Sequence, residues 1–175
     1  MTSVTSTSLQ ELIGDADPRA LAAAGLACLD RCLPLLAPDG ADALRPVWAA
    51  VARGDGVAWG DAMAKAQVEL ESTAGPGAAA APAALVRGML TGAPADWTEA
   101  PLRAWALDCS AAALGAHAHL DATGDGPLHA GELRRQQAVL DSAAHGPTGL
   151  RRARELSTEG GRVLRAVVSR RARTA

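Results

Sequence analysis

The twelve residues from Asp121 to Glu132, which read DATGDGPLHAGE, constrain the fold of this chain more than any other stretch. Oxygen-bearing side chains stand at its positions 1, 3 and 5, and its twelfth residue is a glutamate. Oxygen ligands at this spacing can surround one hard cation within a short loop. Gly126 stands at position 6, where a sharp turn with positive φ is costly for a residue with a Cβ. The stretch therefore predicts a cation-binding loop between two helices.

Six residues present the expected metal ligands: Asp121, Thr123, Asp125, Pro127, His129 and Glu132. The first three offer side-chain oxygens, and Pro127 offers its backbone carbonyl oxygen from position 7. His129, at position 9, acts through a water molecule if at all. Glu132 closes the sphere with two carboxylate oxygens, which brings the number of ligands to about seven. That set favours one Ca²⁺ ion, with Mg²⁺ as the alternative.

This loop and its expected helical flanks resemble the EF-hand family of calcium-binding proteins. The pattern of the loop in that family is D-x-[DN]-x-[DN]-G-x5-E, and this chain departs from it at Thr123, which carries no charge. Three carboxylates in place of four imply weaker calcium binding. The resemblance also implies that Leu128 packs inward and pairs with a second loop. The competing interpretation is a glycine-rich turn between two helices that carries acidic residues without binding a metal.

Three further segments are expected to be degenerate copies of this loop, with first positions at residues 51, 90 and 156. Each lacks most of the liganding acids, so none is expected to bind calcium. Pairing of the loops would join Leu128 to Val163 and Ala58 to Trp97. The chain length and the uneven loops are similar to those of bacterial calerythrin and of the invertebrate sarcoplasmic calcium-binding proteins. In those four-hand proteins some hands have lost their metal.

The sequence predicts an all-α fold of paired EF-hand-like helix–loop–helix units, with one intact loop, up to three degenerate loops and an extra N-terminal helix. Apolar residues recur at helical spacing, as in the helix expected at 99–120. Four Trp supply all the aromatic bulk, because the chain has no Phe and no Tyr. Three segments are expected: 1–40 with a disordered start and the N-terminal helix, 41–105 with a degenerate pair, and 102–175 with a pair that holds the intact loop 121–132.

Other candidate metal ligands fit a protein core better than a metal site. Cys28 and Cys32 stand four residues apart on one face of an expected helix, without a Cys or His partner near them in the sequence. That environment favours small core residues. His117 and His119 stand two residues apart and hence on different faces of a helix, which disfavours a zinc site.

Positive charge concentrates at the C-terminal end of the chain. Residues 151–175 hold eight Arg and two Glu, whereas the rest of the chain carries an acidic excess. Such a segment attracts an acidic partner or anionic lipid, or it forms the solvated face of a helix. The sequence has no signal-peptide pattern, no apolar run that spans a membrane and an odd number of cysteines, so a cytoplasmic protein is expected. We also expect a monomer that binds no nucleic acid.

Two functions follow from these features. The first is calcium-ion binding by the single intact loop, as a cytoplasmic calcium buffer or sensor. The second is a non-catalytic all-α protein-interaction module with vestigial EF-hands, whose partner binds a helical groove or the Arg-rich C-terminal helix. An enzyme is not expected, because no nucleophile–base pair is visible in the sequence.

Overall fold

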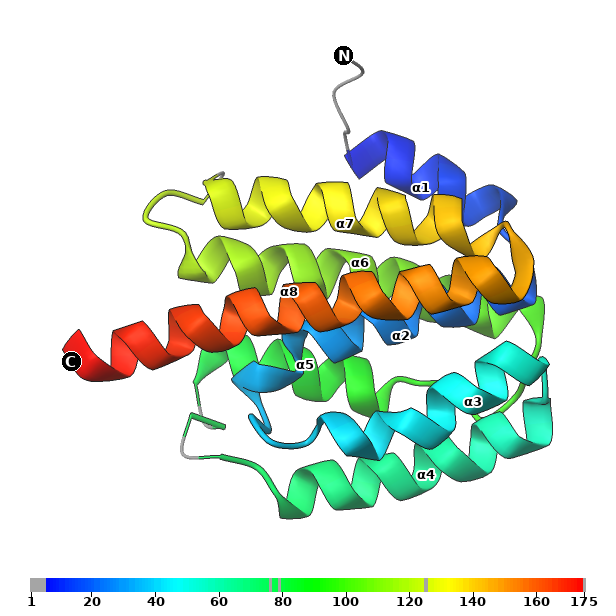
Figure 1. The fold of residues 1–175 in the computed structure, drawn as a ribbon, viewed down its shortest axis with the longest axis horizontal. Coiled ribbons are helices and arrows are strands. Elements are labelled where there is room, and N and C mark those ends of the chain that lie inside the picture. The colour runs from blue at the N-terminus through cyan, green and yellow to red at the C-terminus, as the bar shows by residue number, and fades with distance from the viewer. Residues whose placement is uncertain (1–5, 76, 79, 125, 175) are drawn as a thin grey trace.

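Helices form nearly all of the regular structure of this protein (Figure 1). The structure is a computed structural model that describes residues 6–75, 77–78, 80–124 and 126–174. Its α-helices are α1 (Ser6–Asp15), α2 (Pro18–Cys32), α3 (Arg45–Arg53), α4 (Gly56–Ser72), α5 (Ala81–Thr91), α6 (Glu99–Leu120), α7 (Pro127–Ala143) and α8 (Gly146–Thr174). Two short 3₁₀ helices are η1 (Leu33–Leu35) and η2 (Ala41–Leu44). Because these residues include no strand, the predicted all-α class is confirmed.

Local sequence signals set where several of these helices begin and end. The Asp17 side chain accepts a hydrogen bond of 2.8 Å from a backbone N–H of the first turn of α2, and Pro18 opens that helix. The Asp55 side chain does the same for α4, at 3.0 Å. Gly54, with φ of 63°, ends α3 in the left-handed region that a residue without a Cβ adopts freely. These caps join α3 to α4 through a turn of two residues.

Helix α2, which corresponds to the expected N-terminal helix, lies at the centre of the fold, where it packs against α6, α7 and α8 (Figure 1). Twelve of its fifteen residues are buried, and most of them are Ala or Leu. Small side chains allow neighbouring helices to approach closely. At Gly25, for example, an added Cβ would lie 2.5 Å from the ring of Trp105 on α6. The helix that was expected as an addition to the fold is therefore its central element.

Tryptophans supply the aromatic part of the core, and three of the four meet in one cluster. The ring of Trp59 on α4 meets the rings of Trp97 and Trp105 edge to face, with centroid distances of 5.6 and 5.5 Å. The buried indole N–H groups have partners: Trp59 donates to the carbonyl of Pro94 at 2.8 Å, and Trp105 donates to that of Met89 at 2.9 Å. Such edge-to-face pairs are a preferred aromatic geometry. They take the place of the absent Phe and Tyr side chains.

The expected degenerate loop at 156–167 is wrong, because α8 runs through it without interruption. Its glycine pair predicts a turn, but in the fold Gly160 allows close packing of α8 on α2. An added Cβ at Gly160 would lie 2.5 Å from Cδ of Arg31. Val163 is helical and 37 % exposed, so the expected pairing of Val163 with Leu128 between two loops is also wrong.

The other two degenerate loops are replaced by simple connections between helices. The first, expected at 51–62, shrinks to the turn between α3 and α4. The second, expected at 90–101, corresponds to residues 92–98 between α5 and α6. Ala58 is helical in α4, so the expected bridge from Ala58 to Trp97 does not form; the Trp97 ring packs on Trp59 instead.

One hydrophobic core draws on all three of the expected segments. Leu29 comes from the first segment, Trp59 from the second and Leu164 from the third, and each is fully buried or nearly so. The three segments therefore share one core. None of the described helices combines the length and the apolar character that crossing a membrane requires.

Candidate functional site

The turn between α6 and α7 contains only the first half of the predicted calcium loop. Helix α6 ends at Leu120 and α7 begins at Pro127, so positions 7 to 12 of the loop are helical. Gly126 has φ of −77°, and the expected positive φ is therefore wrong. A glycine is required at position 126 for another reason, since an added Cβ would lie 2.5 Å from Cγ of Asp121. Asp125 lies outside the described residues.

Asp121 acts as the cap of α7. Its Oδ1 accepts a hydrogen bond of 3.0 Å from the backbone N–H of Leu128, and its Oδ2 accepts one of 2.9 Å from that of His129. These N–H groups belong to the first turn of the helix and have no partner within it. The negative charge also suits the positive end of the helix dipole. Both carboxylate oxygens of Asp121 are thus engaged by the helix that follows the turn.

Glu132 lies in the core, away from the turn, and forms an ion pair with Arg31 of α2. Both side chains are fully buried. The Arg31 guanidinium donates from Nη2 to Oε1 at 2.7 Å and from Nε to Oε2 at 2.9 Å, a two-pronged arrangement. Gln136, one turn later on α7, donates to Oε1 at 3.0 Å. Gln136 accepts in turn from the hydroxyl of Ser110 on α6, at 2.5 Å.

His117 of α6 completes the surroundings of Glu132. Its Nδ1 lies 2.7 Å from the carbonyl oxygen of Ala113, and its Nε2 lies 3.5 Å from Oε2 of Glu132. Burial by itself would raise the pKa of Glu132, but Arg31 and His117 offset that effect and hold this pKa below its ordinary value. The Glu132 carboxylate is therefore ionised in the core, with its charge balanced by Arg31.

The predicted ligands that the structure describes do not converge on one point. Asp121 is bound to backbone N–H groups, Glu132 is bound to Arg31, and Thr123 is exposed on the turn. Pro127 and His129 belong to the first turn of α7. Within the part of the chain that the structure describes, no three His, Cys, Asp or Glu side chains are grouped to hold a metal ion. In this arrangement the residues do not fit the seven-coordinate shell that a calcium loop provides.

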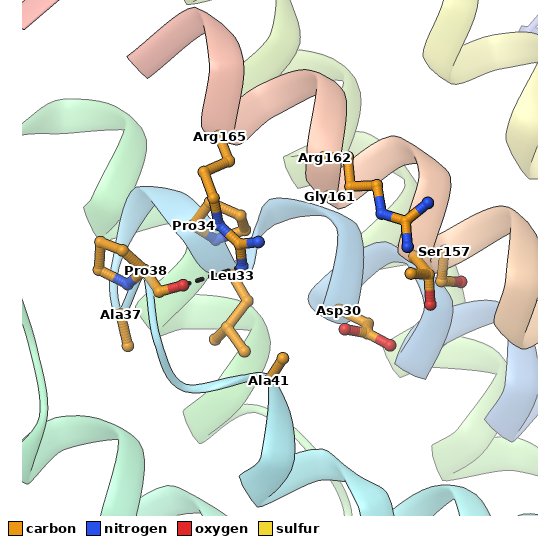
Figure 2. Close-up of a pocket in the computed structure, with 11 residues that line it drawn as sticks. Asp30, Leu33, Pro34, Ala37, Pro38, Ala41, Ser157, Gly161, Arg162 and Arg165 are labelled. Carbon is orange, nitrogen blue, oxygen red and sulfur yellow. Dashed lines mark hydrogen bonds between the residues drawn. The ribbon is translucent and has the colours of Figure 1, made fainter. Parts of the chain in front are cut away.

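A polar cleft lies elsewhere, between the C-terminal end of α2, η1 and the middle of α8 (Figure 2). Its volume is about 220 Å³. Asp30 contributes a carboxylate to it, and Trp48 of α3 donates its indole N–H to Oδ2 of Asp30 at 2.9 Å. From α8, Arg162 and Arg165 line the cleft, and Arg165 donates to the carbonyl of Pro38 at 3.0 Å. The cleft therefore brings one acidic group and two basic groups together with apolar surface.

The last turns of α8 carry the Arg-rich segment and extend to one end of the molecule (Figure 1). Arg171 donates to the carbonyl of Leu120, the last residue of α6, at 2.6 Å. Arg170 and Arg173 are exposed, and neither donates a side-chain hydrogen bond to any described residue. No acidic residue occurs from 160 to 175. One arginine thus fastens the helix end, and the exposed arginines leave it strongly basic.

Sequence reasoning missed Arg31, Asp30 and Gln136 as members of polar sites. A signal for Arg31 was present, because it interrupts an apolar helix between two cysteines and two leucines. A buried Arg needs a buried acid as its partner. Nothing local in the sequence indicates which of the nineteen acids that partner is.

No protein-family model, curated protein or solved structure matches this chain. Its residues therefore take their roles from geometry and charge alone. Two features are left as candidate binding sites, the basic end of α8 and the polar cleft beside Asp30. The buried group around Glu132 links α2, α6 and α7 inside the core.

Proposed function

We propose that this protein is a non-catalytic, all-α interaction module that binds an acidic segment of a protein partner through the C-terminal end of α8. The observation that carries the proposal is the exposed, unpaired state of Arg170 and Arg173 in a stretch without acidic residues. Charges of one sign on a surface attract a partner of the opposite sign and orient its approach. An acidic peptide segment has the charge and the extended shape to follow such a helix.

The anchoring of α8 supports the same proposal. Arg171 holds the helix end to Leu120, and Arg165 holds its middle to Pro38. A helix end that is fixed in this way presents its other arginines in one orientation, so a partner need not order them on binding. The partner's carboxylates would then form charge-assisted hydrogen bonds with guanidinium groups that are already in place.

The test is the binding of a fluorescent oligo-glutamate peptide, measured by anisotropy at low salt, with oligo-lysine as the comparison. We expect saturable binding of oligo-glutamate only, and weaker binding as salt rises. The double variant Arg170→Gln/Arg173→Gln should bind several-fold more weakly, since each exposed ion pair contributes about 0.2–1 kcal/mol.

A matched control removes the same charge elsewhere. Arg53 on α3 and Arg134 on α7 are exposed, and neither pairs with an acid among the described residues. The double variant Arg53→Gln/Arg134→Gln should keep the affinity of the unmodified protein. Equal weakening by both double variants would contradict the proposal, because binding would then follow net charge and not this helix.

Calcium binding stays a prediction of the sequence, and the exposed turn with Asp121 and Thr123 is the feature that favours it. It would require Glu132 to leave Arg31, or the ion to bind without Glu132. Calorimetric titration of chelator-stripped protein with Ca²⁺ tests it. The exposed Thr123→Ala is the informative variant, because it removes a ligand without disturbing the core. One saturable site that this variant weakens would establish the calcium function, and no saturable heat would exclude it.

A further inference from the structure

We propose that the cleft between η1 and α8 binds a small zwitterion, an α-amino acid with an apolar side chain, with its ammonium group on Asp30 and its carboxylate on Arg162. The cleft is distinct from the exposed arginines at the end of α8, so this site does not depend on the proposed function. Three properties of the described cleft support this proposal (Figure 2). They are a carboxylate with one oxygen that accepts no hydrogen bond, a guanidinium without an acidic partner, and an apolar wall.

Asp30 is the acidic group of the cleft. Its Oδ2 accepts from the indole of Trp48, whereas its Oδ1 accepts no hydrogen bond from any described residue. Burial raises the pKa of Asp30, although the hydrogen bond from Trp48 and the charges of Arg31 and Arg154 lower it. A partly buried carboxylate with a free oxygen favours a ligand that brings a positive charge and N–H donors.

Arg162 is the basic group that a ligand's carboxylate would meet. Its side chain is exposed and donates to no acceptor in the described part of the chain. Among the described residues, Arg162 and Asp30 line the same cleft but form no ion pair with each other. The charge of each is therefore not neutralised by the other. Figure 2 shows the two side chains on different helices, Asp30 on α2 and Arg162 on α8. A molecule that carries both charges can therefore engage both helices at once.

The rest of the lining sets the size and the character of the ligand. Leu33, Pro34 and Ala37 form an apolar wall beside the two charged groups. A volume of about 220 Å³ is below the range of about 300–1,000 Å³ that holds drug-sized ligands. A free amino acid has the two charges, a short apolar side chain and a small enough size.

L-Leucine is the probe for the test, and two fragments of it are the comparisons. 3-Methylbutan-1-amine lacks the carboxylate of leucine, and 4-methylpentanoate lacks its ammonium group. Calorimetry gives the affinity, and a change in tryptophan fluorescence that is lost in Trp48→Phe reports on the cleft, because the Trp48 indole donates to Asp30. We expect saturable binding of leucine in the millimolar range and at least tenfold weaker binding of either fragment. Equal binding of leucine and one fragment would overturn the proposal.

Variants assign the two contacts. Asp30→Asn keeps an oxygen that can accept from Trp48 but removes the charge, and Arg162→Gln removes the other charge. Each should weaken leucine binding at least tenfold. Arg151→Gln, an exposed position near the start of α8 that does not line the cleft, should leave it unchanged. Unchanged leucine binding in Asp30→Asn or in Arg162→Gln would contradict the proposal.

One further variant keeps the test decisive if Asp30→Asn does not fold. Ala41 lines the cleft at an exposed position, so a larger side chain there can fill the cleft without entering the core. Ala41→Phe should abolish leucine binding and leave the melting temperature close to that of the unmodified protein. A folded Ala41→Phe protein that binds leucine normally would overturn the site. The Arg170→Gln/Arg173→Gln protein should bind leucine normally, which separates this site from the proposed peptide surface.

Discussion

Arg31 and Glu132 form the polar centre of an otherwise apolar core. Removing two charges from water costs several kcal/mol for each ion, and only close geometry with additional hydrogen bonds compensates for that cost. Here two guanidinium nitrogens and the amide of Gln136 supply those bonds. The pKa of Arg31 is raised despite its burial, because Glu132 stabilises its charge. Each ion is therefore tolerated only because the other is present.

Replacement of one partner should destabilise the protein strongly. Glu132→Gln leaves Arg31 buried without a counter-charge, and we expect the free energy of unfolding to fall by about 3–5 kcal/mol. Urea denaturation in the presence of a chelator measures this, so that the result is independent of calcium. The exposed Arg134→Gln on the same helix should change stability by about 0.5 kcal/mol or less. A Glu132→Gln protein as stable as the original would contradict the role of the ion pair.

Asp30 should make stability depend on pH in the opposite sense from most acids. Burial raises its pKa above the ordinary value of 3.8, so the fold favours its neutral form. The stability that this group contributes is present below pH 3.8 and is lost as pH rises through the pKa of the folded state. Asp30→Asn removes that loss. We expect this variant to melt at or above the temperature of the original near neutral pH, and the advantage to disappear in acid.

The test compares the melting temperatures of Asp30→Asn and of the original protein from acid to neutral pH. A variant that melts well below the original at neutral pH would mean that the ionised carboxylate is favoured in the fold. The hydrogen bond from Trp48 would then outweigh burial in setting the pKa of Asp30. The exposed Asp108→Asn on α6 is the control, and it should follow the original at every pH.

At the scale of elements, the acidic turn before α7 is a helix cap. Asp121 satisfies two of the free N–H groups at the start of α7, and Gly126 leaves room for its carboxylate. Acidic residues and glycine are needed both by a calcium loop and by a turn of this kind. This shared requirement explains why the sequence predicts a calcium loop here although the segment forms a turn that caps α7.

Loss of the cap should destabilise α7 whether or not calcium is present. We expect Asp121→Ala to lower the free energy of unfolding by about 0.5–2 kcal/mol in chelator, as for other lost caps. Asp108→Ala, an exposed acid on the preceding helix, is the control and should have little effect. Equal stability of Asp121→Ala and the original in chelator, with a loss only when calcium is added, would instead support a calcium loop.

The molecule as a whole is held together by α2. Because this helix packs on α6, α7 and α8, segments far apart in the sequence depend on one another. We expect a single cooperative unfolding transition in urea. Loss of helix followed by circular dichroism and exposure of the four tryptophans followed by fluorescence should coincide. Two separated transitions would contradict the shared core and would agree with an independent unit at 102–175.

Much of the fold was predictable where the signal is local. The helical spacing of apolar residues at 99–120 predicts α6, which the structure confirms, and Asp17 and Pro18 are local signals for the start of α2. The glycine pair at 160–161 misled the prediction, because glycine ends some helices and lets others pack closely. The close approach of Arg31 to Gly160 shows that the second role applies here, and that contact exists only in the folded protein.

The sequence by itself determined the helical class, the N-terminal cap of α2 and the basic charge of the C-terminal segment, because each depends on residues that are neighbours along the chain. Tertiary structure alone decided what Glu132 and Asp30 do. The partner of Glu132 is 101 residues away, and Asp30 lines a cleft with residues of α8. A carboxylate has the same oxygens beside a cation, a guanidinium or an indole, so its role is set by whichever group the packing of helices places against it.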